Sequence, residues 1–341
     1  MNSHITIKDI AKALGISTST VSRALSDAWD VKRETRDQVL EMARKLNYHP
    51  NLNAKNLQNK RTGAIGIIIP EFVSSFFPNV VMGIQDVLYT ANYHIFITQS
   101  GESRSQELDN MRLLREHMVE GILISTTNEG GNEDAYKELM DGGMPLVFFN
   151  RCPKTLSAPK VMIDDCLMAE KAVEHLISTG RREIWHLLGP VNLEVSAMRA
   201  QGFANAMRRN GLDPEGRSFP AGIFINDGRE AMERLLAGRG ALPDALFCFN
   251  DPVAIGAMKA LKSAGIRVPE DVAIVGFSEG SMATVVEPQL TTVLQPMREM
   301  GREAARLLLG QLKPGRRPAP QTVCLDAKLN IRASSAVGKE D

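Results

Sequence analysis

The sequence predicts a small all-α domain at the N-terminus, followed by a larger α/β domain built from two doubly wound parallel sheets. Three observations lead to this fold class. Apolar residues recur at helical spacing in the first 48 residues. From residue 62 onward, short apolar runs alternate with segments of helical period. This alternation occurs in two series, which predicts two lobes.

Two short helices are expected at the start of the chain. The first covers residues 7–14, and Thr6 with Asp9 can begin it as a capping box. Gly15 ends it, because a residue without a Cβ can adopt the left-handed conformation of a tight turn. A second helix follows at 18–25. The pair is typical of a helix-turn-helix that enters a DNA groove, although an ordinary helical hairpin has the same spacing.

Charge is unevenly distributed along the chain. Residues 1–62 contain eleven Lys or Arg and six Asp or Glu, a net charge of +5. The whole chain is formally neutral, so the remainder carries −5. A basic N-terminal domain suits binding to DNA phosphates, and a solvated helical surface can show the same excess.

Composition indicates a globular protein without a membrane segment. Of the 341 residues 43% are hydrophobic, and no apolar run approaches the 18 or so residues needed to cross a bilayer. The first residues lack the apolar core of a secretory signal, so we expect a cytoplasmic protein. The four cysteines are far apart and form no C-x-x-C pair, which predicts reduced core residues.

The sequence favours neither an enzyme nor a metal or cofactor site. It contains no G-x-S-x-G, Walker A or G-x-G-x-x-G motif, and its six histidines form no H-x-x-x-H pair. His175 and His186 are expected to be hydrogen-bonded core or helix-end residues.

The first 25 residues carry a specific pattern, T-x-x-D-I-A…G-x-S-x-x-T-V-S-R-x-L. It resembles the N-terminus of the lactose-repressor (LacI/GalR) family of bacterial transcription regulators. The residues that carry the resemblance are Thr6, Asp9, Ile10, Ala11, Gly15, Ser17, Thr20, Val21, Ser22, Arg23 and Leu25. The resemblance implies a homodimeric regulator of double-stranded operator DNA.

The expected DNA contacts fall into two sets. Thr18, Ser19 and Arg23 would read base edges in the major groove. Thr6, Ser17, Thr20 and Ser22 would lie near phosphates.

A third helix, at 34–46, is expected to close the N-terminal domain. Its entry departs from the family pattern, because Lys32 stands where a capping Ser is usual. Two interpretations remain open: the helix starts less firmly, or Lys32 reaches a phosphate.

Residues 49–61 resemble the family's hinge, P-N-x-x-A-x-x-L, at Pro50, Asn51, Ala54 and Leu57. A helix of this length is too short to be stable alone in water, so it should form only when something holds it. The resemblance implies that operator DNA and the hinge of a partner subunit do so. The resemblance implies that Ala54, Lys55 and Leu57 contact the minor groove, with Leu57 as a wedge between base steps. A plain flexible linker is the alternative.

The body of the chain, residues 62–332, alternates strands and helices throughout. Strands are expected at 64–69, 94–98, 121–125, 146–150 and 161–163 in the first series, and at 184–188, 223–225, 245–249 and 272–275 in the second. Motifs such as FNDPVAIGA (249–257) and VPEDVAIVGF (268–277) resemble the family's periplasmic-binding-protein-like effector domain. That fold implies three crossings between the lobes, near residues 160, 291 and 322. The tail, 333–341, is expected to be disordered.

The resemblance also implies a cleft between the lobes that binds a small-molecule effector, a sugar or sugar derivative. The expected site residues are Phe76, Phe77, Arg199, Asn250, Asp251, Ser278 and Glu279. A ligand role is favoured for Phe76, Arg199 and Asn250, and a structural role for Phe77 and Asp251. Ser278 stands where many relatives have an Asp that binds the effector, and Glu279 could substitute for it.

Together with the family resemblance, the residues predict a DNA-binding transcriptional regulator, a repressor, whose operator affinity is set by an effector. Two alternatives belong to other classes. A solute-binding protein of a transport system shares the two-lobed body but has no use for residues 1–62. A DNA-binding regulator could instead answer to a protein partner.

Overall fold

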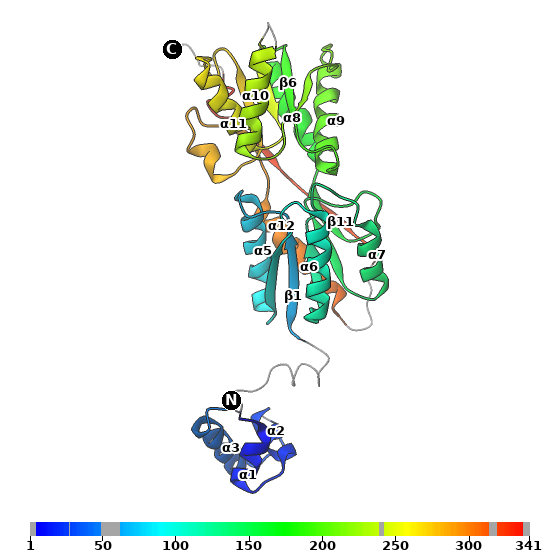
Figure 1. Ribbon diagram of the computed structural model, residues 1–341, viewed down its shortest axis with the longest axis vertical. Coiled ribbons are helices and arrows are strands. Elements are labelled where there is room, and N and C mark those ends of the chain that lie inside the picture. The colour runs from blue at the N-terminus through cyan, green and yellow to red at the C-terminus, as the bar shows by residue number, and fades with distance from the viewer. Residues whose placement is uncertain (1–4, 27, 49–61, 239–241, 314–318, 337–341) are drawn as a thin grey trace. The chain divides into compact units, whose positions relative to one another are not determined.

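The computed structural model describes residues 5–26, 28–48, 62–238, 242–313 and 319–336 (Figure 1). The chain forms two compact units, Met1–Thr62 and Gly63–Asp341. Each unit has a hydrophobic core of its own. In the described part of the chain, none of the helices combines the length and the apolar character needed to span a membrane.

The first unit contains the helices α1 (Ile7–Leu14), α2 (Thr18–Leu25) and α3 (Arg33–Lys45). The Asp9 carboxylate accepts hydrogen bonds from the Thr6 backbone N–H and hydroxyl, both at 2.8 Å, and these bonds lower the pKa of Asp9. Gly15 ends α1 at φ 65°, as predicted. The buried core consists of Ile10, Ala11, Val21, Ala24, Val39 and Ala43.

Lys32 precedes α3 and makes no side-chain capping hydrogen bond. The helix nevertheless forms from Arg33, one residue before the predicted start, because Val39 and Ala43 bury its inner face.

The first lobe of the second unit is built on a parallel sheet in the order β11-β5-β4-β3-β1-β2. Helices α5 and α12 cover one face, and α6 and α7 cover the other. The apolar run of β1 is buried along its whole length, as a strand covered on both faces requires. The elements are β1 (Ala64–Ile69), α5 (Phe76–Thr90), β2 (His94–Gln99), α6 (Arg104–Glu116), β3 (Gly121–Ile124), α7 (Glu133–Asp141), β4 (Leu146–Phe149), β5 (Lys160–Ile163), α12 (Met297–Gln311) and β11 (Thr322–Leu325).

The second lobe has a sheet in the order β12-β10-β9-β8-β6-β7. Helices α8 and α9 cover one face, and α10 and α11 the other. All neighbours are parallel except β12, which is antiparallel to β10. The elements are α8 (Asp165–Ser178), β6 (Ile184–Leu188), α9 (Glu194–Arg209), β7 (Ser218–Pro220), α10 (Ile225–Gly238), β8 (Ala245–Cys248), α11 (Asp251–Ser263), β9 (Ala273–Ser278), the 3₁₀ helix η1 (Ser281–Thr284), β10 (Thr291–Leu294) and β12 (Lys328–Asn330).

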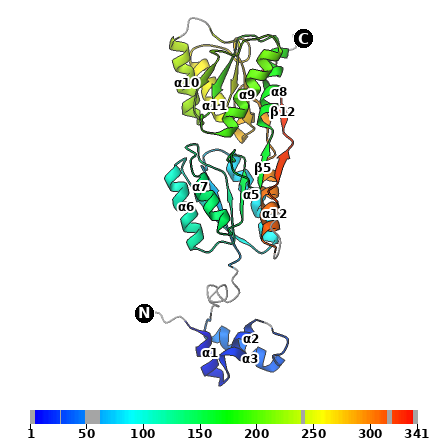
Figure 2. The same ribbon diagram turned by 90° about the vertical axis from the view of Figure 1, so that its right-hand side faces the viewer.

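The chain passes between the lobes three times, after β5, after β10 and after β11. The crossings fall at residue 164, at 295–296 and at 326–327, four to five residues later than predicted. Figure 2 shows β5, β12 and α12 along one side of this unit. The largest hydrophobic cluster of the unit contains residues of both lobes, and further clusters lie on the other faces of the two sheets.

The predicted strand at 223–225 is wrong. The strand of this series is β7, at Ser218–Pro220, and Ile225 is already the first residue of α10. Gly222 turns the chain at φ 77°, and the Asp227 carboxylate then accepts hydrogen bonds from the backbone N–H groups of residues 223 and 224 at 2.9 Å. The apolar residues 223–225 therefore lead into helix α10 and do not form a strand.

The expectation of a disordered tail is wrong for residues 333–336. Ser334 and Ser335 are buried. The Ser334 hydroxyl donates to the Ile274 carbonyl at 2.6 Å and accepts from the Thr291 N–H at 2.8 Å. The Ser335 hydroxyl lies 2.7 Å from His175 Nε2. Polar side chains thus join this segment to the second sheet, which composition could not indicate.

All four cysteines are free, and two of them depart from the predicted core position. Cys152 and Cys248 are buried, whereas Cys166 is half-buried and Cys324 is exposed on the edge strand β11.

Candidate functional site

The exposed side of α2 carries the residues predicted to meet DNA. Ser17 caps the helix by accepting a hydrogen bond from the Thr20 N–H at 3.1 Å. Its hydroxyl also lies 2.7 Å from that of Ser19 and 2.8 Å from that of Thr20. Thr18 and Ser19 are exposed and Ser22 is half-buried. The hydroxyl groups of Ser17, Ser19 and Thr20 therefore form hydrogen bonds at the start of α2 and stay near the surface of the unit.

Arg23 is in the last turn of α2 and forms an ion pair with Asp30 of the following loop. Its side chain is 54% exposed, so it takes no part in the core of this unit. The sequence did not suggest this pair, because Asp30 lies beyond the end of the helix. The remaining predicted DNA contacts, Ala54, Lys55 and Leu57, lie outside the described residues.

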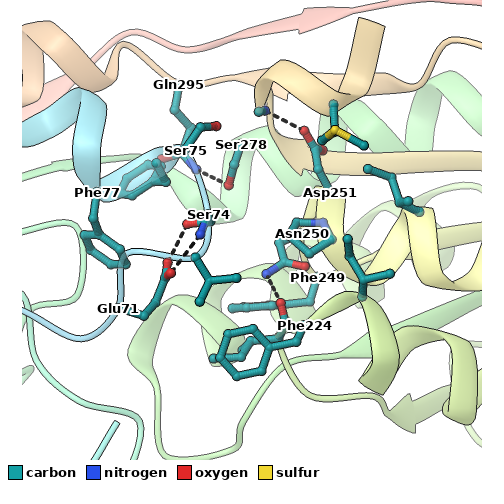
Figure 3. Close-up of a pocket in the computed structure, with 18 of the residues that line it drawn as sticks. Glu71, Ser74, Ser75, Phe77, Phe224, Phe249, Asn250, Asp251, Ser278 and Gln295 are labelled. Carbon is teal, nitrogen blue, oxygen red and sulfur yellow. Dashed lines mark hydrogen bonds between the residues drawn. The ribbon is translucent and has the colours of Figure 1, made fainter. Parts of the chain in front are cut away.

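A cavity of about 770 Å³ lies at the carboxyl ends of the strands of both lobes. Its walls come from the segments that follow β1 and β4 in the first lobe, and β7, β8 and β9 in the second. Figure 3 shows Glu71, Ser74 and Ser75 facing Asn250 and Asp251 across it.

The segment after β1 forms the wall on the side of the first lobe. The Glu71 carboxylate accepts hydrogen bonds from the Ser74 N–H at 2.8 Å and from the Ser74 hydroxyl, which holds this turn closed. Phe76 and Phe77 follow at the start of α5, with ring centroids 5.1 Å apart in an edge-to-face arrangement. Both rings line the cavity, yet only 6% of Phe76 and 2% of Phe77 is exposed.

Arg199 enters the cavity wall from α9 and is buried. Its Nε donates to Asp165 Oδ1 at 2.8 Å, and its Nη1 donates to the Phe249 carbonyl at 2.6 Å. The guanidinium also lies over Phe277, with Cζ 3.7 Å from the ring centroid. Burial lowers the pKa of Arg199, and the adjacent Asp165 carboxylate opposes that shift. The charge is thus held by fixed partners within the wall.

Arg151, two residues after β4, provides a second cation at the cavity wall. Its Nη1 donates to both carboxylate oxygens of Glu102, at 2.8 and 2.9 Å. Its Cζ lies 5.5 Å from the ring centroid of Phe77. Each of the two arginines is therefore matched by a carboxylate of its own lobe.

Asn250 and Asp251, directly after β8, both have structural partners. Asn250 Oδ1 accepts from the Val253 N–H at 2.9 Å and caps α11, and its Nδ2 donates to the Ile223 carbonyl at 2.9 Å. Asp251 accepts from the Thr292 hydroxyl and, at 2.8 Å, from the Gly280 N–H. Burial raises the pKa of Asp251 to about 6. Figure 3 draws one of these bonds at Asn250 and one at Asp251 as dashed lines.

Ser278 and Gln295 meet at the cavity. Gln295 Nε2 donates to Ser278 Oγ at 3.0 Å (Figure 3). Gln295 lies in the segment between β10 and α12 and is 2% exposed, and its Oε1 has no hydrogen-bond partner among the described residues. Ser278 has φ 113°, an uncommon conformation for a residue with a Cβ. A buried amide with one unpaired end therefore lies next to a strained residue at this corner of the cavity.

Glu279 does not replace the missing aspartate. It is not among the residues that line the cavity. Its carboxylate binds the Arg332 guanidinium and the Asn330 amide instead, because the side chain turns toward β12. The prediction of Glu279 as a substitute contact is therefore wrong.

The other predicted effector residues do line the cavity, namely Phe76, Phe77, Arg199, Asn250, Asp251 and Ser278. The sequence interpretation missed Glu71, Arg151 and Gln295. All three lie within two residues of the end of a strand, and that position was the available signal. Among the described residues no group of three or more His, Cys, Asp or Glu is placed to hold a metal ion.

The fold and the cavity define a class: a helix-turn-helix unit joined to a two-lobed ligand-binding body. Comparison with known proteins agrees. Residues 6–51 match the family described as bacterial regulatory proteins, lacI family, and residues 173–335 match the periplasmic binding protein-like domain.

Individual relatives cover nearly the whole chain. Catabolite control protein A of Priestia megaterium is 33% identical over 307 residues, 89% of this chain and 92% of the relative. The transcriptional repressor CytR of Escherichia coli K12 is 32% identical over 97% of this chain and 96% of its own. The solved complex of the transcriptional regulator CelR with cellobiose has a TM-score of 0.74 at 28% identity, and covers 97% of this chain and 99% of that one. The chain belongs to the lacI family and is a DNA-binding transcriptional regulator.

Proposed function

We propose that this protein is a cytoplasmic repressor without catalytic activity that binds a near-palindromic operator as a homodimer. An uncharged small molecule, a sugar or sugar derivative, binds in the cavity between the lobes and sets the operator affinity. The cavity of about 770 Å³, walled by strand ends of both lobes, carries this proposal. A ligand that touches both lobes stabilises one relative placement of them, which is the requirement for coupling to DNA.

The charges around the cavity favour an uncharged ligand. Arg151 is paired with Glu102, and Arg199 with Asp165. Two further carboxylates, Glu71 and Asp251, line the cavity, against one further cation, Lys259. Positive charge is therefore not in excess, whereas a phosphate or carboxylate ligand is usually bound by unpaired Arg or Lys donors.

The shape of the wall suits a ligand with a flat apolar face and hydroxyl groups. Phe72 and Phe224 are half-exposed at the cavity, and aromatic rings stack on sugar or base faces. Gln295 and Ser278 can bond a hydroxyl. The similar regulator CelR is known in complex with cellobiose, a neutral disaccharide, which supports the same class here.

A homodimer is supported by exposed apolar residues at the edge of the first lobe. The edge strand β2 exposes Phe96 and Ile97, and the flanking helix α5 exposes Met82 and Tyr89. Exposed apolar side chains of this kind are candidates for an interface. A second copy of the chain is the expected partner, because a palindromic operator requires two recognition helices.

A ligand screen of the full-length protein tests the proposed effector class. Mono- and disaccharides, cellobiose among them, and nucleosides are compared with sugar phosphates and sugar acids by thermal shift and calorimetry. An uncharged ligand at about 100 times its Kd should stabilise the protein by about 2.7 kcal/mol. It should also change operator binding in a gel-shift assay.

Gln295→Ala should lower the affinity for that ligand at least several-fold, because it removes the amide with an unpaired oxygen at the cavity. Gln201→Ala, an exposed glutamine on α9, is the matched control. Stabilisation by anionic ligands alone would contradict an uncharged effector. Operator binding with no small-molecule response would favour a protein partner, and binding of a sugar without any DNA affinity would favour a solute-binding protein.

A further inference from the structure

The loop between α2 and α3 places a carboxylate beside the arginine of the recognition helix. Asp30 is in this loop, and its side chain is 31% exposed and ion-paired with Arg23. An acidic side chain is unfavourable near DNA phosphates, because the two charges repel each other. Its presence at the exposed end of α2 therefore needs a compensating role.

The backbone on both sides of Asp30 is fixed to the helices. The Ala28 N–H donates to the Arg23 carbonyl at 3.0 Å, and the Val31 N–H donates to the Ala28 carbonyl at 3.3 Å. Arg36 of α3 donates to the same Ala28 carbonyl from Nη2 at 2.7 Å. The carboxylate is thus presented beside the guanidinium by a segment whose backbone is hydrogen-bonded to both helices.

A guanidinium in an ion pair keeps donors for another partner. It carries five N–H groups in a planar fork, and one carboxylate occupies at most two of them. The remaining donors can bond the two acceptors of a guanine, O6 and N7, in the major groove. A fork that is held in one orientation loses less freedom on binding and tolerates fewer alternative bases.

We propose that Asp30 is a specificity-determining residue, which positions Arg23 for a single base pair and weakens binding to non-operator DNA. The proposal rests on the role of Arg23 as a base reader. The carboxylate acts in two ways: it orients the fork, and its charge repels phosphates wherever Arg23 lacks its correct base. On non-operator DNA the carboxylate still repels phosphates, but the oriented fork finds no matching base.

The test uses the full-length protein and two duplexes. One is the consensus that the protein selects from a random DNA library, and the other is a shuffled duplex of the same composition. Affinities are measured by fluorescence anisotropy over a range of salt concentrations. Asp30→Asn should bind the shuffled duplex about threefold more tightly, with a salt slope steeper by about one. The ratio of consensus to shuffled affinity should fall about tenfold.

Three further variants separate the causes. Asp37→Asn removes a charge from an exposed position on α3 and should leave the ratio unchanged. Asp30→Glu keeps the charge but moves the carboxylate, so the ratio should fall while the affinity for shuffled DNA stays low. Arg23→Ala should lower the ratio by itself, and Asp30→Asn should then lower it no further.

Each contrary result has a distinct meaning. The positioning role is overturned if Asp30→Asn raises the affinity for both duplexes by the same factor. It is also overturned if Asp30→Asn lowers the ratio of consensus to shuffled affinity in the Arg23→Ala background. If Arg23→Ala weakens binding to both duplexes by the same factor, Arg23 does not read a base, and the inference fails with it.

Discussion

Asp165, His186, Arg199 and Asp251 are ionisable side chains buried in the second lobe, close to the cavity. Three of them have partners: Asp165 binds Arg199, and Asp251 binds Thr292 and the Gly280 N–H. His186 differs, since neither ring nitrogen has a hydrogen-bond partner among the described residues. It lies between the rings of Phe203 and Phe247, at centroid distances of 5.2 and 4.8 Å. The expectation of a hydrogen-bonded His186 is therefore wrong.

His186 should make the stability of the second lobe depend on pH. Burial, with a smaller contribution from Arg199, lowers its pKa to about 3, against about 6.5 for an ordinary histidine. Between these two values the unfolded chain binds a proton that the folded chain does not. This difference costs the folded state about 1.4 kcal/mol for each pH unit below about 6.5.

We expect His186→Leu to be more stable than the wild type by about 1–3 kcal/mol at pH 7.5, because it removes an unpaired buried polar group. This advantage should grow as the pH falls toward 4.5. Urea unfolding followed by the fluorescence of Trp185, buried in the same lobe, measures both effects. Asp251 has a raised pKa and the opposite pH dependence, but it is present in both proteins, so its effect cancels in the difference. If the difference in stability between the two proteins stayed constant with pH, His186 would not have the lowered pKa given above.

At the scale of elements, the contact between α5 and α12 joins two helices of the first lobe that lie far apart in the sequence. Two glycines permit the close approach of these helices. A Cβ on Gly83 would lie 1.9 Å from the Arg298 carbonyl oxygen, and one on Gly301 would lie 2.0 Å from that of Val80. Asp86 joins the same helices through Arg298 and Arg302, at 2.8 and 2.9 Å, and these bonds lower the pKa of Asp86 to about 2.

Gly301→Ala should destabilise the protein by about 1–3 kcal/mol, since the new methyl group forces two packed backbones apart. Gly310→Ala on the same helix is the matched control, because nothing lies within 4 Å of its added Cβ. This control should be neutral or more stable by up to about 1 kcal/mol, as alanine favours a helix more than glycine does. Thermal unfolding of the two variants compares them directly. If the two variants changed the stability equally, α5 and α12 could move apart without loss of stability.

At the scale of the whole molecule, regulation requires that a cavity in one unit influence a DNA contact made by another. The two lobes share three crossing segments and one hydrophobic cluster with residues of both, so a ligand between them can change how they are placed. The coupling cannot exceed the ligand's differential affinity for the two arrangements, typically about 1–3 kcal/mol. Pairing of two chains through the first lobe would transmit that change to both recognition helices.

Phe96→Asp should convert the protein to a monomer, because it places a charge in the proposed dimer surface on β2. The monomer should bind the palindromic duplex at least about a hundredfold more weakly, since half of the contacts are lost. It should keep its effector affinity, because Phe96 does not line the cavity. Leu167→Asp, at an exposed position on α8, is the control. Sedimentation and anisotropy measurements check these outcomes, and a variant that remains dimeric would exclude this surface.

The local patterns of the sequence predicted most elements. The capping box of Thr6, the glycine stop at Gly15 and the apolar run of β1 give information within a few residues, because backbone conformation there depends on immediate neighbours. The family resemblance likewise indicated where the effector cavity would form. The same patterns failed at residues 223–225, where the Asp227 side chain and Gly222 turned an apolar run into a helix start.

Residues distant in sequence decided the rest. Asp30 meets Arg23, Glu279 meets Arg332, and Ser334 meets Thr291 only once the chain has folded. The sequence by itself determined the class of protein, its two-lobed fold and the strand ends that line the cavity. Tertiary structure decided which charges are neutralised and which polar atoms remain unpaired. The reason is physical: secondary structure follows local backbone preferences, whereas the state of a charge depends on partners brought within a few ångströms by folding.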